Sequence, residues 1–444
     1  MHVRGRNGGM NRPFTCVCGV SLALLLPLLA IAQQPPGPAA VDWPAFRGRS
    51  GDGRVAWLPD KVPAKKLLWQ IPSNPDVNGG MAAAEGVVVV SDWDGKQDIW
   101  LGLDLATGRQ LWKRTFANAR EIDEESAAGG RLLWKQSHPD NSQMEFGGAP
   151  RATPVVAIGK VYGLSAFGEL YCFDLKTGQT VWQKDLTAEF KTGDVPTWGY
   201  CSSPLLAGGK LIVNPGGKTA VAALNPDDGK VLWKGEGNGI NYSSPIVGTF
   251  GGVEQVVYFD ATSLGGWSLA DGKRLWKIKA ETSGGYIVPS PLAIDGRLLV
   301  AYEGGDPKLY EFAEGGAIKP EPAASADGDL LAPEVVTPTL ANGMILGFHD
   351  ALVALNPQTL EQHWMNDQEP AFMGPIHIVS SGNTILTFDD RGTMALATVS
   401  KEGAKVIGKL KLCGGTLAHP TLADGKIIVR DSKGIYCYDL TATD

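Results

Sequence analysis

The sequence of 444 residues lacks the features that assign many proteins to a function class at once. Its 40 basic and 47 acidic residues give a net charge of −7 with no basic cluster, which excludes the electrostatic footprint of a nucleic-acid-binding protein. No CxxC, CxxCH or HExxH motif occurs, so zinc, c-type haem and zincin sites have no support. Long amphipathic helical stretches are also absent. The 57 glycines and 29 prolines instead predict a chain with frequent turns.

The first 32 residues have the organisation of a secretory signal. Arg4, Arg6 and Arg12 precede an apolar run that ends in Ala30-Ile31-Ala32. This order predicts cleavage after residue 32 and a location in the periplasm or outside the cell, whereas the alternative interpretation is a transmembrane anchor. No cysteine directly follows the apolar run, so we expect no lipid anchor and no membrane anchor after cleavage.

An internal repeat predicts the architecture. The phrase LDLATGRQLW, which ends at Trp112, returns as FDLKTGQTVW, LNPDDGKVLW, WSLADGKRLW and LNPQTLEQHW. A second phrase, in which Pro or a substitute is followed five or six residues later by Gly and then by a β-branched run, occurs eight times. Equivalent positions recur about every 43 residues, and a period of this length with about four short strands per unit is typical of a β-propeller.

We therefore predict an all-β fold, an eight-bladed β-propeller. The last unit ends before its Trp could occur, whereas Lys65 to Trp69 supply a strand and a Trp with no unit before them. The N-terminal strand is thus expected to close the ring and to remove its exposed edges. The predicted organisation is a signal peptide over 1–32, an N-terminal extension over 33–60 and a single propeller domain over 61–444.

The recurring residues have a structural explanation. We interpret the Trp as a plug that packs on the neighbouring blade, and the Thr-Gly or Asp-Gly pair as a hairpin turn that needs a positive φ. The mature chain contains Cys172, Cys201, Cys413 and Cys437, which lie mostly in distant units. We expect four free thiols, with Cys413 and Cys437 as the pair most able to form a disulfide.

Propeller geometry also predicts where a ligand would bind. The innermost strands line the channel, so residues just before the aligned prolines should cluster at one mouth. The candidate ligand-binding residues there are Arg151, Tyr200, Asn241, Tyr242, Tyr286 and Glu334. Arg151 would bind a carboxylate or phosphate, and the tyrosines would stack on a flat ligand. The alternative is a channel plugged by polar groups that satisfy one another.

Two unusually long intervals, after Trp112 and after Trp182, predict insertions beside the same mouth. We assign no catalytic residue and no metal ligand. The mature chain's histidines stand in different units at no metal-ligand spacing, and we interpret them as surface or turn residues: His138, His349, His363, His377 and His419.

The D-x-x-T-G-x-x-x-W phrase resembles the repeat of the pyrroloquinoline-quinone (PQQ) propeller superfamily, which includes quinoprotein alcohol dehydrogenases and the outer-membrane assembly lipoprotein BamB. The segments DWPAFRG at 42–48, GAPRATP at 148–154 and YSSP at 242–245 are similar to exported PQQ-binding-like propeller repeat proteins. The resemblance implies a PQQ-repeat type of propeller.

For function, we expect a non-catalytic, monomeric binding or scaffolding protein without a cofactor, whose propeller face binds a protein partner or a small polar ligand. The alternative that the resemblance implies is a PQQ-dependent dehydrogenase acting on alcohols or sugars, with PQQ and Ca²⁺. Such enzymes have an adjacent cysteine pair and Glu, Asn and Asp metal ligands. This chain has no adjacent cysteines after residue 32, although Asn241 and Glu334 could face the axis.

Overall fold

The computed structural model describes residues 41–75, 77–117, 148–193, 195–280, 286–331 and 336–443. The chain divides into a short unit, Met1–Pro35, and a large unit, Pro36–Asp444. The predicted signal peptide over 1–32 lies outside the described residues, so its cleavage remains a prediction.

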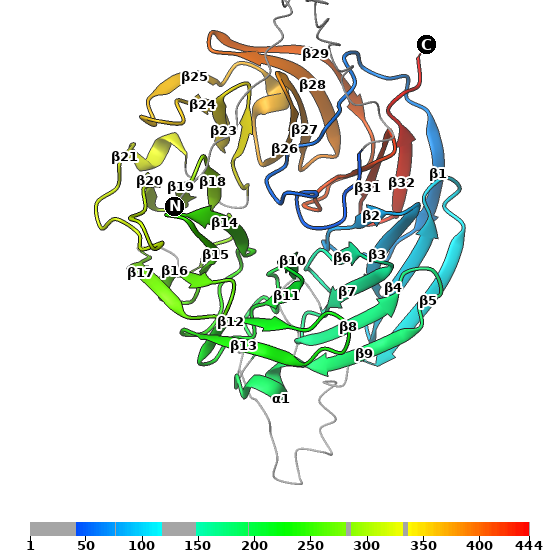
Figure 1. Cartoon of the computed structure of the whole chain (residues 1–444). Coiled ribbons are helices and arrows are strands. Elements are labelled where there is room, and N and C mark those ends of the chain that lie inside the picture. Colours follow the sequence, from blue (N-terminus) through cyan, green and yellow to red (C-terminus); the bar gives the residue numbers. More distant parts are fainter. Residues whose placement is uncertain are drawn as a thin grey trace, which may run out of the picture. The chain divides into compact units, whose positions relative to one another are not determined.

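The described residues form eight antiparallel, four-stranded sheets that follow one another around a ring, as Figure 1 shows. This confirms the predicted eight-bladed all-β propeller. From the innermost strand outward, blade 1 contains β2 (Ala82–Ala84), β3 (Val87–Trp93), β4 (Gln97–Asp104) and β5 (Gln110–Ala117). Blade 2 contains β6 (Val155–Ala157), β7 (Lys160–Leu164), β8 (Glu169–Asp174) and β9 (Thr180–Asp185). Blade 3 contains β10 (Leu205–Ala207), β11 (Lys210–Val213), β12 (Thr219–Leu224) and β13 (Val231–Glu236).

The same pattern continues through the second half of the chain. Blade 4 contains β14 (Ile246–Phe250), β15 (Val253–Phe259), β16 (Ser263–Ser268) and β17 (Arg274–Lys279). Blade 5 contains β18 (Leu292–Ile294), β19 (Arg297–Tyr302), β20 (Gly305–Tyr310) and β21 (Ala324–Ser325). Blade 6 contains β22 (Thr339–Ala341), β23 (Met344–His349), β24 (Ala351–Leu355) and β25 (Gln362–Asn366). Blade 7 contains β26 (Ile376–Ser381), β27 (Thr384–Asp389), β28 (Thr393–Ser400) and β29 (Gly403–Lys411).

Blade 8 joins the two ends of the chain. It contains β30 (Thr421–Ala423), β31 (Lys426–Arg430), β32 (Gly434–Asp439) and, as its outermost strand, β1 (Leu67–Pro72). Strand β1 pairs antiparallel with β32, with Trp69 opposite Cys437. The buried Arg430 of β31 strengthens the junction, because its Nη1 donates to the backbone oxygens of Gly79 and Ser91 beside and within blade 1. The predicted closure by the N-terminal strand is confirmed.

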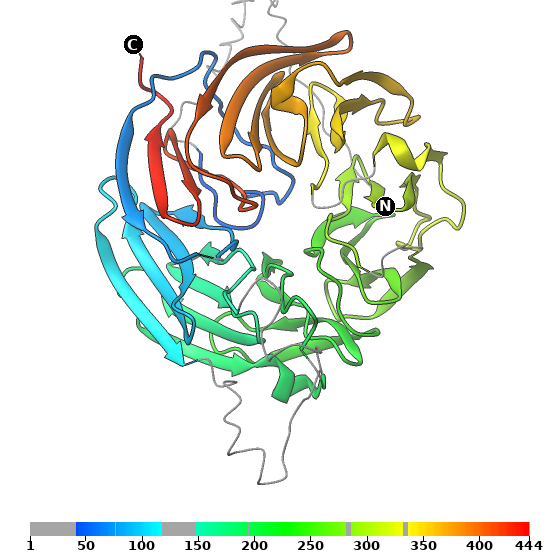
Figure 2. The same cartoon turned by 180° about the vertical axis from the view of Figure 1, so that it is seen from behind.

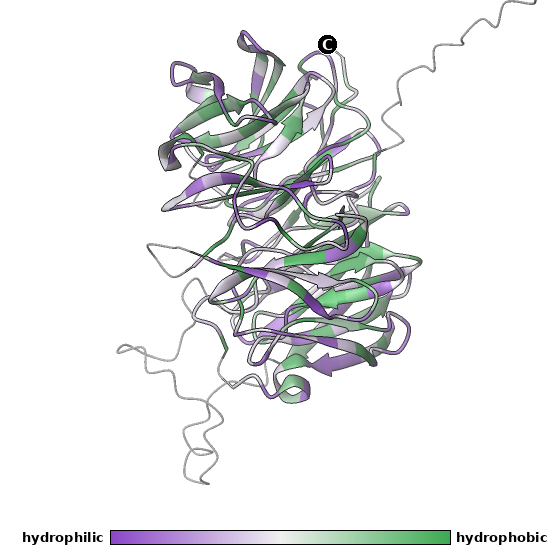
Figure 3. Cartoon of the chain, turned by 60° about the vertical axis from the view of Figure 1, so that its left-hand side comes forward, coloured by the Kyte–Doolittle hydropathy of each residue, from purple (hydrophilic) through white to green (hydrophobic). Residues whose placement is uncertain are grey.

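Hydrophobic residues lie mainly along the strands, as the colouring of Figure 3 shows, so the core is the set of interfaces between neighbouring blades. The repeat Trp fills these interfaces. Trp112 donates its indole N–H to the backbone oxygen of Leu175 in blade 2 at 2.7 Å. Trp69, Trp182, Trp233 and Trp364 make the equivalent bond to the next blade. The interpretation of the Trp as an inter-blade plug therefore holds at these positions.

The glycine of the repeat lies directly under this Trp. Gly178 has a φ of 66°, and a Cβ at this position would lie 2.5 Å from the indole of Trp112. Gly159 has a similar φ of 68°, but a Cβ there would meet nothing within 4 Å. Both glycines therefore have a positive φ, but only Gly178 lacks room for a side chain.

We expect Gly178→Ala to destabilise the protein by about 1–3 kcal/mol more than Gly159→Ala, because only the former pushes a methyl group into a packed indole. Urea unfolding of the two variants measures the difference. Equal losses of unfolding free energy would show that the Trp does not pack tightly on this turn.

Residues 41–60 form a segment that lies inside the ring, and we call it the N-terminal strap (Figures 1 and 2). Trp43 exchanges two backbone hydrogen bonds with Ala83 of β2, at 2.9 and 2.8 Å. On the other side, Val55 donates to Ser380 of β26, and Ser380 donates to Gly53. Trp43 is 1% exposed and packs in the core between blades 7 and 8. Residues 41–60, which the sequence analysis assigned to an N-terminal extension over 33–60, thus bond to inner strands of the propeller on both sides, and the boundary at residue 61 stays a prediction.

Removing residues 1–72 should prevent soluble folding, because it leaves β32 without its partner strand and exposes its edge. Removing residues 1–40 is the matched control and should leave the unfolding midpoint within the error of the wild-type protein. Circular dichroism and size-exclusion chromatography of both truncations measure this. A folded, monomeric protein without residues 1–72 would contradict the closure.

All four cysteines of the described residues are free thiols, as the sequence analysis expected. Cys172, Cys413 and Cys437 are buried.

Candidate functional site

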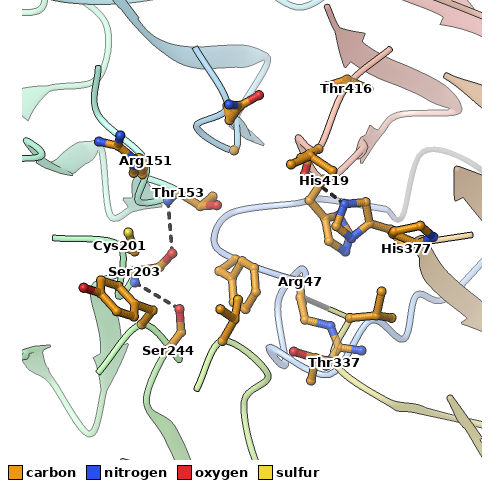
Figure 4. A pocket seen from close by; sticks show the side chains of 18 of the residues that line it. Arg47, Arg151, Thr153, Cys201, Ser203, Ser244, Thr337, His377, Thr416 and His419 are labelled. Carbon is orange, nitrogen blue, oxygen red and sulfur yellow. Dashed lines mark hydrogen bonds between the residues drawn. The ribbon is translucent and has the colours of Figure 1, made fainter. Parts of the chain in front are cut away.

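A cavity of about 220 Å³ lies where the inner ends of the blades meet the strap. Figure 4 shows side chains from opposite sides of the ring around it. Those used below are Phe46, Arg47, Arg151, Thr153, Cys201, Ser203, Tyr242, Ser244, Val288, Val336, Thr337, Ile376, His377, Leu417 and His419.

Of the predicted site residues, Arg151 and Tyr242 line this cavity. Arg151 donates weakly to the backbone oxygen of Ala149 at 3.4 Å. Burial lowers the pKa of its guanidinium, against the opposing effects of Cys201 and Tyr242. Burial raises the pKa of the Cys201 thiol to about 11, so this thiol is neutral at physiological pH.

Tyr286 belongs to an aromatic group that reaches the cavity through Tyr242. Its ring lies 4.8 Å from that of Trp198 in an edge-to-face arrangement, and the rings of Trp198 and Tyr242 are 4.9 Å apart. Trp198 comes from the second predicted insertion, which also contains the short helix α1 (Leu186–Phe190). The first predicted insertion falls largely on residues 118–147, outside the described residues. We call Trp198, Tyr242 and Tyr286 the aromatic cluster.

Two other predicted residues are turned into the protein. Tyr200 is buried and donates its hydroxyl to the backbone oxygen of Pro215 at 2.8 Å. Asn241 is also buried, and its Oδ1 accepts from the backbone N–H groups of Tyr242 and Ile287. Their polar atoms hold the loops before the inner strands. Glu334 lies outside the described residues.

A row of hydroxyl side chains that was not predicted from the sequence, which we call the hydroxyl belt, also lies at the inner ends of the blades: Thr153, Ser203, Ser244, Ser290 and Thr337. Each of the first four donates its backbone N–H to the hydroxyl oxygen of the next, always at 3.0 Å. Figure 4 shows two of these bonds. The belt links blades 2 to 6, and its signal was present as a Ser-Pro or Thr-Pro pair at the start of five consecutive units.

Two histidines of the opposite side were also misjudged. His419 is buried and His377 is partly exposed, with their rings 4.5 Å apart beside the cavity. His377 Nε2 bonds to the backbone oxygen of Leu417, and His419 Nδ1 bonds to that of Pro420. Since carbonyl oxygens only accept, these nitrogens carry the protons. The interpretation of these two residues as surface or turn histidines is therefore corrected. His138 lies outside the described residues.

Burial keeps both imidazoles neutral. It lowers the pKa of His377 from its ordinary 6.5 to about 4, although the bond to Leu417 opposes this effect. Burial, with the neighbouring His377, lowers the pKa of His419 well below its usual range. The nearby Arg47 guanidinium acts in the same direction on both histidines.

Arg47 enters from the strap and is 3% exposed. Its Nη2 donates to the backbone oxygens of Pro338 at 2.8 Å and Asp52 at 3.1 Å, whereas its Nη1 has no hydrogen-bond partner among the described residues. Burial lowers the pKa of this guanidinium to about 10, so it remains charged at neutral pH.

Acidification should destabilise the protein through the two histidines. Their pKa values are lower in the folded than in the unfolded state, so their contribution is complete above pH 6.5 and is lost as the pH falls towards 4. Between pH 7 and pH 4.5, the unfolding free energy of the wild type should therefore fall by about 1–3 kcal/mol more than that of the His377→Gln variant. Urea unfolding at the two pH values measures this. His363→Gln, on the outer strand β25, is the control, and an equal pH dependence in all three proteins would contradict the assignment.

Comparisons with known proteins agree with this architecture. The family described as outer membrane protein assembly factor BamB matches residues 119–285. The outer membrane protein assembly factor BamB of Shewanella oneidensis is 21% identical over 361 residues, which cover 76% of this chain and 87% of the relative. The quinohemoprotein alcohol dehydrogenase structure from Comamonas testosteroni has a TM-score of 0.62 at 13% identity, covering 91% of this chain and 81% of that chain. In its repeat and its fold, this chain is similar to PQQ/BamB-like propeller proteins.

A second relative of this PQQ/BamB-like propeller is an enzyme. The quinohemoprotein alcohol dehydrogenase ADH-IIG of Pseudomonas putida is 32% identical over 155 residues, which cover 32% of this chain and 20% of the enzyme. The chain thus matches only about a fifth of that relative's length.

The cavity was tested against the Ca²⁺-bound quinone that the enzymatic alternative needs. Among the described residues, no three His, Cys, Asp or Glu side chains gather into a possible metal site. The side-chain oxygen of Asn241 is occupied by two backbone N–H groups. The described lining of the cavity thus holds one carboxylate, that of Asp390, and Glu334 lies outside the described residues. In the same part of the chain, no helix has the length and hydropathy needed to cross a bilayer.

Proposed function

We propose that this PQQ/BamB-like propeller is a non-catalytic binding or scaffolding protein that acts after export, in the periplasm or outside the cell. The mature chain begins after residue 32, is monomeric and recognises a protein partner at the mouth of the channel. The observation that carries this proposal is the aromatic cluster, which stands partly exposed beside Arg151.

The composition of this mouth suits protein recognition. Trp, Tyr and Arg are the residue types that contribute most binding energy at protein interfaces. Trp198 is held in place because its backbone N–H donates to the hydroxyl of Tyr242 at 3.4 Å. The blade 7 and blade 8 segments add two exposed apolar side chains, Met373 at 44% and Leu417 at 52%, of which Leu417 also lines the cavity. Exposed apolar surface of this kind commonly marks an interaction site.

The relatives support a partner of a particular kind. The chain covers 87% of a protein named for outer membrane protein assembly. We therefore propose that the partner is a component of outer-membrane protein assembly, bound by the aromatic cluster and Arg151.

Site-specific crosslinking tests this proposal in cells. A photoreactive amino acid at Tyr286 should give a discrete adduct with an outer-membrane assembly component, identified by mass spectrometry. The control position is Val181, which is 46% exposed on the outer strand β9. With the purified partner, Trp198→Ala should weaken binding about 30-fold, the equivalent of about 2 kcal/mol at an interface hot spot. No adduct at Tyr286, or an equal adduct at Val181, would contradict the proposal.

The second candidate, a PQQ-dependent dehydrogenase of alcohols or sugars, is favoured by the 32% identity of one segment to a quinohemoprotein alcohol dehydrogenase. Mixing the purified mature protein with PQQ and Ca²⁺ distinguishes the two candidates. A bound quinone spectrum together with dye reduction by alcohols would favour the enzyme. Our proposal expects neither signal.

A further inference from the structure

We propose that the central cavity is a binding site for one small organic carboxylate, held between Arg47 of the strap and the hydroxyl belt. This goes beyond the partner proposed above, because the groups that form the site lie inside the ring and do not depend on what binds the aromatic cluster.

Arg47 supplies the charge. No carboxylate of the described residues forms an ion pair with its guanidinium, and Nη1 has no hydrogen-bond partner. The negative charge of Asp52 raises the pKa of Arg47, but the Asp52 carboxylate forms its ion pair with Arg54, with Oδ2 2.7 Å from Nε. A buried cation without a counter-ion is unfavourable. An anion in the cavity would provide the missing negative charge.

The hydroxyl belt supplies hydrogen-bond donors. Thr153, Ser203, Ser244 and Thr337 line the cavity. The oxygen of each of the last three already accepts a backbone N–H. A hydroxyl that accepts in this way still has its own hydrogen to donate. No acceptor for these three hydroxyl hydrogens lies within the described part of the chain, so this wall favours a ligand with acceptor oxygens.

The charge and size of the cavity indicate the ligand class. The described lining carries two guanidinium groups, those of Arg47 and Arg151, and one carboxylate, that of Asp390, so a single negative charge would balance it, whereas a phosphate dianion would leave excess negative charge buried. Arg151, on the other side in Figure 4, has interactions within the protein, and both histidines are neutral. At about 220 Å³ the cavity is smaller than pockets for drug-sized ligands, which are roughly 300–1,000 Å³.

Part of the remaining lining is apolar, although polar residues such as Asn78 and Asp390 also contribute to it. Phe46, Val288, Val336 and Ile376 contribute hydrocarbon surface to the same cavity. The site therefore combines guanidinium groups and several hydroxyl donors with an apolar surface, which suits a small carboxylate with an apolar body rather than a bare inorganic anion.

Ligand-observed fluorine NMR with 4-fluorobenzoate as the probe tests this site in the mature protein. The neutral isostere 4-fluorobenzamide and inorganic phosphate are the comparison ligands. We expect 4-fluorobenzoate to bind at least tenfold more tightly than either. Arg47→Gln should weaken the binding of 4-fluorobenzoate at least tenfold.

Arg47 also holds the strap in place through its bonds to Pro338 and Asp52, so its replacement can reduce stability as well as binding. A second variant therefore tests binding without changing Arg47. Val288→Phe fills the cavity, leaves Arg47 in place and should abolish binding. Ser243→Ala is the matched control, since Ser243 is a fully buried neighbour of Ser244 whose hydroxyl has no partner and which does not line the cavity. It should bind 4-fluorobenzoate like the wild type. Absence of 4-fluorobenzoate binding, equal binding of the amide or of phosphate, or unchanged binding in Val288→Phe would overturn the proposal.

Discussion

The fold depends on one antiparallel pairing, that of β1 with β32. A four-stranded blade has two faces and cannot bury both of them alone, so each blade needs a neighbour on either side. A linear row of blades would still leave two terminal faces exposed. Pairing the N-terminal strand with the last unit joins the ends of the row. Each blade face is then covered by a neighbouring blade. Trp69 then makes across the junction the same indole-to-backbone bond that links other blades, and Arg430 adds two bonds to backbone oxygens there.

The N-terminal region also contributes side chains to the cavity, through the strap that precedes β1. The strap fastens to β2 on one side and to β26 on the other, and between these contacts it brings Phe46 and Arg47 to the cavity wall. The hydroxyl belt covers blades 2 to 6, whereas the histidine pair comes from blades 7 and 8. The ring is therefore approximately symmetric in its blades and asymmetric at its centre.

The repeated features were predictable because the same physical requirement recurs in every blade. The phrase that runs from Pro to Gly predicted the number of blades, the Trp phrase predicted the plug and the turn glycine, and the unfinished last unit predicted the closure. The strap was not predictable, because DWPAFRG occurs once and its partners Ala83 and Ser380 are remote in sequence. An alignment of repeats cannot reveal a segment that has no equivalent.

The candidate site was only partly predictable for a related reason. Position before the aligned proline selects Arg151 and Tyr242, which line the cavity, but it does not show whether a side chain faces the cavity or the protein. Asn241 and Tyr200 turn inward because unpaired backbone groups need partners there. His377 and His419 have no metal-ligand spacing, yet the closed ring places them side by side.

Native-state hydrogen exchange tests most directly the central claim that one N-terminal region is built into the ring. The backbone N–H groups of Trp43 and Val55 are bonded to Ala83 and Ser380. Our account predicts that these two amides exchange with nearly the same opening free energy as the amides of the neighbouring strands β3 and β27, since the strap and the blades should open together. Fast exchange of the strap amides, while those of β3 and β27 remain protected, would contradict it.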